Sequence, residues 1–170
     1  MDEKHPEYVI ACYTRMRWNM SQEILLVLKN RPATQAGRLN LIGGKIEDGE
    51  TPEQAAIREM KEEAGYDVRG PAKVVGTMQD RHLKIYCVNA FSQSDNAPPK
   101  PREGETESVE WMFVHSLLKD KRLIPNLRVI IPLILMGVEG FHIDDNIASI
   151  NRPMHDFKIT VPTYMEASLG

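Results

Sequence analysis

The feature that most constrains the fold is one helix whose beginning and end are both marked in the sequence. Thr51 is a suitable N-cap, Pro52 occupies the first helical position, and Gln54 completes the spacing of a capping box with Thr51. Gly65 provides a C-terminal stop. We therefore predict a helix over Pro52–Ala64.

This helix carries two different faces. At about 100° per residue, Glu59, Glu62 and Glu63 fall within one arc, whereas an adjoining arc is apolar and should pack against the protein. The apolar arc consists of Ala56, Ile57, Met60 and Ala64. Like charges three and four positions apart repel, so the acidic arc requires a positive partner. Hard oxygen ligands suit Mg²⁺ or Mn²⁺. The alternative is a solvated acidic face without a ligand, which is what most glutamate-rich helices carry.

Strands are predicted on both sides of the helix, from runs rich in β-branched and aromatic residues. Tyr8–Tyr13 and Glu23–Leu28 suit an antiparallel pair, and Leu39–Ile42 forms a short strand that runs into a Gly43-Gly44 turn. Three further strands are expected after the helix: Val74–Met78, Leu83–Phe91 and Ser108–Val114.

Two other segments are distinguished by their prolines. Ser92–Arg102 holds three prolines and is predicted to be an exposed loop, and Leu127–Gly137 is predicted to be a buried helix despite Pro132. The apolar run Val129–Val138 holds about ten residues, whereas a membrane-spanning helix needs roughly twenty. It is therefore expected to be core.

The composition favours one ordinary domain and excludes a general nucleic-acid surface. The chain has 170 residues, of which 42% are hydrophobic, so residues 1–170 are read as a single domain. Residues 140–170 show no clear period and are read as a C-terminal extension of unknown role. The net charge is -3 and the basic residues form no run, which favours a nucleotide over a nucleic acid polymer.

The beginning of the chain and its two cysteines suggest a cellular compartment. The N-terminal residues lack the apolar region of a signal peptide. Cys12 and Cys87 stand alone without the spacing of a metal or redox motif. We expect both to be reduced, buried thiols in a cytoplasmic protein.

The helix belongs to a longer pattern of fixed residues. From Gly44 the sequence reads Gly-x5-Glu50-x7-Arg58-Glu59-Met60-x-Glu62-Glu63-x-Gly65-Tyr66. This resembles the Nudix box, G-x5-E-x7-R-E-U-x-E-E-x-G-U with U a bulky apolar residue, at every fixed position. The resemblance implies the α/β Nudix fold, an α/β/α sandwich around a mixed sheet, in which the box forms a catalytic loop-helix-loop.

The resemblance also implies roles for the residues of the box. Glu59, Glu62 and Glu63 are expected to bind Mg²⁺, for which Mn²⁺ is a substitute, together with the backbone carbonyl of Gly43. Either Glu59 or Glu63 is expected to orient the attacking water as well. Glu50 and Arg58 are expected to support this site. Arg58 is either a phosphate ligand or an ion-pair partner of Glu62; the i,i+4 spacing favours the ion pair, which would orient the carboxylates.

Within this superfamily the sequence looks most like the MutT-type nucleoside triphosphate pyrophosphohydrolases. The similarity extends beyond the box to three segments: Gly44–Ala55, Asp80-Arg81-His82 and Glu110-Trp111-Met112. The pyrophosphohydrolase reaction would be water attack on phosphorus, which converts an ordinary or oxidised nucleoside triphosphate to monophosphate and pyrophosphate.

Positions counted from Trp111 suggest further site residues. Glu105 lies six residues before it, where MutT-type enzymes carry another metal-binding glutamate, and Asn126 lies fifteen residues after it, where they carry a base-contacting asparagine. Glu103 and Glu107 are alternatives to Glu105, and all three also fit an ordinary acidic loop. Asn126 also fits a helix N-cap, because it follows a proline and precedes the apolar helix.

The remaining substrate residues are suggested by similarity and by departures from it. Arg81 is a second candidate for base contact, although it also fits a surface residue beside a turn. Leu41 replaces an aromatic residue that can line the base pocket in MutT, and Ile42 stands where many relatives have proline. These departures leave the identity of the substrate open, so that hydrolysis of ADP-ribose, a nucleotide sugar or a dinucleoside polyphosphate is an alternative. A third alternative is a non-catalytic nucleotide-binding module, which loss of box carboxylates would favour, whereas all of them are present here.

Overall fold

The fold is built on one mixed sheet. The computed structural model describes residues 5–92, 98–144 and 158–162. The strands in these parts are β1 (Glu7–Met16), β2 (Gln22–Leu28), β3 (Leu39–Lys45), β4 (Ala72–Gln79), β5 (Lys84–Ser92), β6 (Ser108–Phe113), β7 (Phe141–Asp144) and β8 (Lys158–Thr160). Their order in the sheet is β6-β2-β3-β1-β5-β4-β7-β8. β1 pairs with β5 and β4 with β7 in parallel, and the other pairs are antiparallel.

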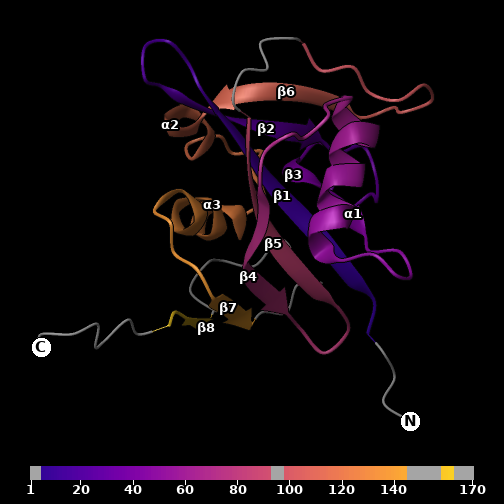
Figure 1. Ribbon diagram of the computed structural model, residues 1–170, viewed down its shortest axis with the longest axis vertical. Helices are drawn as coiled ribbons and strands as arrows, with labels where there is room; N and C mark the ends of the chain where they lie inside the picture. Colours follow the sequence, from indigo (N-terminus) through magenta and orange to yellow (C-terminus); the bar gives the residue numbers. More distant parts are fainter. Residues whose placement is uncertain (1–4, 93–97, 145–157, 163–170) are drawn as a thin grey trace, which may run out of the picture.

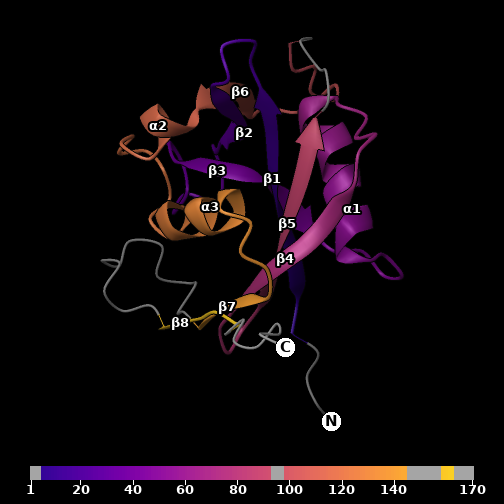
Figure 2. The same cartoon turned by 60° about the vertical axis from the view of Figure 1, so that its left-hand side comes forward.

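Helices cover both faces of this sheet (Figure 1). On one face lies α1 (Pro52–Glu59), which continues directly into the π-helical turn η1 (Met60–Ala64). On the other lie α2 (Val114–Leu117) and α3 (Leu127–Leu135), as Figure 2 shows from a second direction. Each face buries its own apolar cluster, one around Ala56 and Met60 of the first helix and one around Ile130 and Ile131 of α3. The expected α/β/α sandwich around a mixed sheet is confirmed.

The prediction of a turn at Gly43-Gly44 was wrong, because strand β3 continues through both glycines to Lys45. Gly43 pairs with Ile10 of β1 in the sheet. A methyl group added to Gly43 would run into the carbonyl oxygen of Val9. The glycine therefore serves close approach of two backbones within the sheet rather than a change of chain direction.

The predicted helix is confirmed, with a difference at its C-terminal end. Both hydrogen bonds of the capping box between Thr51 and Gln54 are present, and Gly65 ends the helix in the left-handed conformation at φ 75°. The last turn, Met60–Ala64, is π-helical, so the α-helical part ends at Glu59. Ile57 was wrongly placed on the packing face: it is 38% exposed, and Ala55 is buried in its stead.

The C-terminal part contributes to the sheet. β7 lies parallel to β4, where Thr77 shares a hydrogen bond of 2.8 Å with His142, and β8 adds a short strand at the edge. Neither strand was expected from the sequence. Residues 93–97 of the predicted loop, and residues 145–157 and 163–170 of the extension, lie outside the described residues.

The expectation of two buried, free cysteines is met. Cys12 and Cys87 are free and buried, and burial raises the pKa of each thiol to about 12, so both are inert at neutral pH. In the described ranges no helix has the length and apolar character needed to cross a membrane.

Candidate active site

Arg58 is the centre of the ionic contacts on α1. Its guanidinium donates to both oxygens of Glu50 at 2.8 and 3.0 Å and to Glu59 at 2.8 Å. It also donates to the carbonyl oxygen of Lys45 at 2.9 Å, while Glu62 lies at a longer 3.5 Å. The planar fork of arginine suits this two-pronged contact with Glu50. Arg58 thus holds the loop before the helix against the acidic side chains.

These contacts change the acidity of the groups involved. The hydrogen bond from Arg58 lowers the pKa of Glu50, with a smaller contribution from the amide of Glu47. The carboxylates in turn raise the pKa of Arg58, with Glu50 contributing most. Both groups therefore stay charged at neutral pH, so the ion pair that holds the loop in place persists there.

Glu59 lies against Gly44 of β3. A methyl group added to Gly44 would overlap the carboxylate of Glu59, so the missing side chain leaves the space that the carboxylate occupies. Burial raises the pKa of Glu59, although Arg58 opposes the shift. The absence of a side chain at Gly44 is therefore what allows the carboxylate of Glu59 to lie against β3.

Glu63 is the most buried carboxylate of the helix, at 8% exposure. One oxygen accepts a hydrogen bond from the amide of Gly43 at 3.2 Å, and the other lies 3.8 Å from the amine of Lys29. Burial raises the pKa of Glu63 to about 7, even though Lys29 and the Gly43 amide both act to lower it. The charged form of Glu63 is therefore only partly compensated by the protein.

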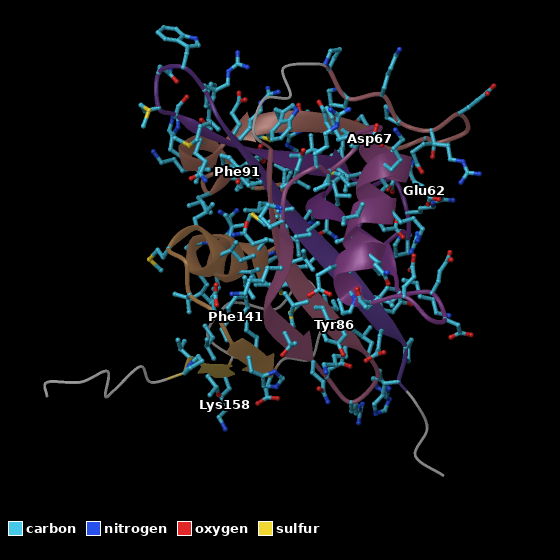
Figure 3. All side chains as sticks on the ribbon, in the orientation of Figure 1. Glu62, Asp67, Tyr86, Phe91, Phe141 and Lys158 are labelled. Atoms are coloured by element: carbon cyan, nitrogen blue, oxygen red, sulfur yellow. The ribbon has the colours of Figure 1, made fainter. Side chains whose placement is uncertain are left out.

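Glu62 is the most exposed of the three, with 39% of its side chain accessible. Besides Arg58, it has Arg102 at 3.4 Å. Figure 3 shows it near the upper end of the helix, at the margin of the molecule. The three carboxylates of the expected arc therefore lie in different surroundings: Glu63 lies against Gly43 of β3, whereas Glu62 is accessible to solvent. Successive residues of a helix are about 100° apart, so neighbours can face different parts of the molecule.

The residues of the box fit a divalent cation by their chemistry. Within the described ranges no three acidic, histidine or cysteine side chains are grouped as a ready-made metal site. Arg58 forms an ion pair with Glu59 at 2.8 Å, and the amine of Lys29 lies 3.8 Å from Glu63. Oxygen donors on one rigid helix are nevertheless what Mg²⁺ and Mn²⁺ prefer, and burial leaves Glu59 and Glu63 short of positive charge.

The loop glutamates are placed differently from one another. Glu105 accepts hydrogen bonds from the amides of Thr106 and Glu107 in its own loop, and Glu103 is exposed. Glu107 is buried, and its carboxylate lies 2.5 Å from the amine of Lys29, which in turn faces Glu63. Of the three alternatives, Glu107 is the one that Lys29 connects to a glutamate of the box.

Lys29 was missed by the sequence reading. It follows directly on the apolar run of β2, where a lysine is an ordinary strand end, and nothing in its local spacing relates it to the box. Only the pairing of β2 with β3 and β6 brings it beside Glu63. A long-range pairing of this kind leaves no local signal.

The candidate substrate residues do not share the ionic contacts of the box. Leu41 is buried in the cluster on the α3 face, and Arg81 is exposed and donates to His82 at 2.9 Å. Asn126 occupies the N-cap position of α3, as the alternative expected, but its side chain makes no capping hydrogen bond. Its amide nitrogen instead lies 3.5 Å from the sulfur of Met78 in β4, on the inner side of the helix.

Two buried oxygens have no hydrogen-bond partner in the part of the chain that the structure describes. They are Oδ1 of Asn126 and Oδ2 of Asp80. Met78 and Asp80 are two residues apart at the end of β4, and Asn126 contacts Met78. A buried acceptor without a partner is costly, so this region suits a ligand that brings donors.

Comparisons with known proteins bear on this site. The model of the family described as NUDIX domain matches residues 10–134. An 8-oxo-dGTP diphosphatase of Escherichia coli is 33% identical over 105 residues, which are 60% of this chain and 78% of that protein. An ADP-sugar pyrophosphatase of Mus musculus is 33% identical over 94 residues, which are 51% of this chain and 43% of that protein.

A solved structure shows the same architecture. It comes from work on MutT of Aliivibrio salmonicida and Vibrio cholerae, with 25% identity and a TM-score of 0.60. The match covers 78% of this chain and 99% of that one. The shared fold therefore extends over nearly the whole of the solved chain.

Proposed function

This chain belongs to the NUDIX domain family, and from that premise we propose that it is a Mg²⁺-dependent pyrophosphohydrolase of nucleoside triphosphates. Mn²⁺ would replace Mg²⁺. Water attacks phosphorus and splits a phosphoanhydride bond, so that a triphosphate yields monophosphate and pyrophosphate. The relationship to an 8-oxo-dGTP diphosphatase supports an ordinary or oxidised purine nucleotide as the substrate.

One observation carries this proposal: the helix places two carboxylates, whose negative charge the protein compensates only in part, against the consecutive glycines of β3. Glu59 lies against Gly44, and Glu63 accepts a hydrogen bond from Gly43. A solvated acidic face would leave these groups in water. Their burial instead favours a bound cation, with Glu62 as the accessible third carboxylate.

The bound cation would neutralise phosphate charge and lower the pKa of the attacking water. Glu59, Glu62 and Glu63 would hold it together with the carbonyl of Gly43. Arg58 positions Glu59 and fixes the preceding loop through Glu50, so we assign it the supporting role rather than that of a phosphate ligand. Glu63, whose buried carboxylate has a raised pKa, suits the acceptance of a proton from the water.

The base would be bound on the other side of the sheet, beside α3. Oδ1 of Asn126 and Oδ2 of Asp80, which have no hydrogen-bond partner among the described residues, could accept hydrogen bonds from the donor groups on the edge of a purine. Leu41 would supply apolar contact. Arg81 would act only from the margin of this region, since its side chain is exposed and bonded to His82. Glu105 remains a proposed additional metal ligand on the facing loop.

The second candidate is hydrolysis of an ADP-sugar, which the relationship to the mouse ADP-sugar pyrophosphatase favours. The chemistry at phosphorus is the same, and the leaving group is a sugar phosphate instead of pyrophosphate. The chain spans less than half of that relative, whereas it spans more than three quarters of the diphosphatase.

A nucleotide panel tests the proposal. The purified chain is incubated with purine and pyrimidine triphosphates, their 8-oxo derivatives and ADP-ribose, with Mg²⁺ or with chelator, and the products are separated by chromatography. We expect monophosphate and pyrophosphate from a purine triphosphate, with Mg²⁺ only. Turnover of ADP-ribose alone would support the second candidate, and turnover in chelator would contradict both.

A further inference from the structure

Lys29 and Glu107 face each other across the end of a strand pair. Leu28 of β2 is paired with Ser108 of β6, so the residues just beyond them, Lys29 and Glu107, lie opposite. The amine of Lys29 lies 2.5 Å from one oxygen of Glu107. The other oxygen accepts a hydrogen bond from the amide of Asn30 at 2.9 Å. Glu107 has only 3% of its side chain exposed.

Lys29 also has a second acidic neighbour. Its amine is 3.8 Å from the nearer oxygen of Glu63, beyond hydrogen-bond distance. A single amine therefore stands between two carboxylates, and its contact is with Glu107. The oxygen of Glu63 that faces Lys29 is the one that the Gly43 amide does not occupy.

We propose that Glu107 is a positioning residue that holds the amine of Lys29 away from Glu63 and so keeps Glu63 available to the cation. The inference rests on the proposed function, because it takes Glu63 to be a metal ligand. A cation and an ammonium group compete for the same carboxylate oxygen. Whatever retains the ammonium group elsewhere therefore favours metal binding.

The competition predicts what each substitution does. In Glu107→Gln, Lys29 keeps Glu63 as its charged neighbour and moves into contact with it, so the cation binds more weakly. In Lys29→Met the competitor is gone, and the charge of Glu107 no longer matters for this purpose. The effect of Glu107→Gln should therefore depend on the presence of Lys29.

The test is a double-mutant cycle on Mn²⁺ affinity, without nucleotide, from the electron paramagnetic resonance signal of free Mn²⁺. The proteins are the wild type, Glu107→Gln, Lys29→Met and the double variant. We expect Glu107→Gln to weaken Mn²⁺ binding about tenfold in the wild-type background, and less than about twofold in the Lys29→Met background. Glu110→Gln is the matched control, since Glu110 is an exposed carboxylate on the same strand β6.

An equal loss in both backgrounds would overturn the inference, because a general charge effect is independent of Lys29. A loss of the same size in Glu110→Gln would overturn it as well. Glu107→Asp provides a second cycle if Glu107→Gln fails to fold: it keeps the charge but shortens the side chain, and it should weaken binding only when Lys29 is present.

The two proposals fail in different ways. A wild type that hydrolyses nucleotides and binds Mn²⁺, but gives an additive cycle, contradicts only the role of Glu107. A wild type that binds no Mn²⁺ removes the metal basis of the proposed function and overturns the inference with it.

Discussion

At the scale of single residues, burial separates glutamates that look alike in the sequence. Glu62 and Glu63 are neighbours in the box, yet one is accessible and the other is buried on Gly43 with a raised pKa. The sequence predicts all three acidic residues of the helix as candidates. It could not rank them, because their difference arises from contacts with β3, which no local pattern in the sequence reveals.

Gly44→Ala is predicted to lower activity more than stability. The added methyl group meets the far end of the Glu59 side chain, which can move away at little cost to the fold. The displaced carboxylate is then lost to the cation. We expect kcat/KM to fall by about tenfold or more, the loss associated with disturbed support of a metal ligand. Steady-state kinetics and a melting curve test this prediction; an unchanged kcat/KM would contradict it.

Asn126→Ala is predicted to reduce discrimination between bases. The side chain makes no capping bond, and its buried Oδ1 has no hydrogen-bond partner among the described residues, so this oxygen can accept a hydrogen bond from a base. We expect kcat/KM for the preferred purine nucleotide to fall by about tenfold, or about 1.4 kcal/mol, with little change for a poor pyrimidine substrate. Asn126→Ser should not restore the loss, because serine presents no amide. Equal losses toward both substrates, or full rescue by serine, would refute base readout.

At the scale of elements, local signals decided what the sequence could predict. The capping box of Thr51 and Gln54, the proline between them and Gly65 are all signals that act within a few residues, and the structure has the helix that they predict. The strands up to β6 follow from their apolar runs in the same way. Gly43 and Gly44 were wrongly predicted to form a turn. Gly43 is required by the close approach of strand β1, which is distant in the sequence and gives no local signal.

Thr51→Ala is predicted to destabilise the protein without removing a metal ligand. The hydroxyl of Thr51 accepts a hydrogen bond of 3.2 Å from the amide of Gln54, and removal of the hydroxyl leaves that donor unpaired. We expect the free energy of unfolding to fall by about 1 kcal/mol. Chemical denaturation measures it, and Thr51→Ser is the control because serine also caps a helix. Equal stability of the alanine and serine variants would contradict the capping role.

At the scale of the whole molecule, strand order creates the site. β3 lies between β1 and β2, and this order sets Gly43, Lys29 and the helix side by side. The sequence predicted the sandwich through resemblance to a family, but it could not predict Lys29 or the strands β7 and β8. A contact between strands that are distant in the chain leaves no periodic pattern in the sequence, and strand β8 is too short to show an alternation of polar and apolar residues.

The stability of the metal-free protein should fall as pH rises from about 5 to 8. The pKa of Glu63 is raised from its ordinary 4.5 to about 7. The folded protein therefore holds the proton longer than the unfolded chain, and the stability present below pH 4.5 is lost as pH rises through 7. The loss from this group is roughly 3 kcal/mol at most.

Glu63→Gln isolates this contribution. Denaturation in chelator should show the gap in unfolding free energy between variant and wild type moving in favour of the variant as pH rises. Added Mg²⁺ should reduce the fall in the wild type, because the cation stabilises the ionised carboxylate. Parallel pH profiles for the two proteins would contradict the raised pKa.

The most direct test of the central claim is pyrophosphate release from a purine nucleoside triphosphate by the wild type, Glu62→Gln and Glu63→Gln, each with Mg²⁺ and with chelator. The site predicts release by the wild type with Mg²⁺ only, and a loss of about a hundredfold or more in both folded variants. Release in chelator, or near-normal release by both variants with Mg²⁺, would contradict metal-dependent hydrolysis by these carboxylates.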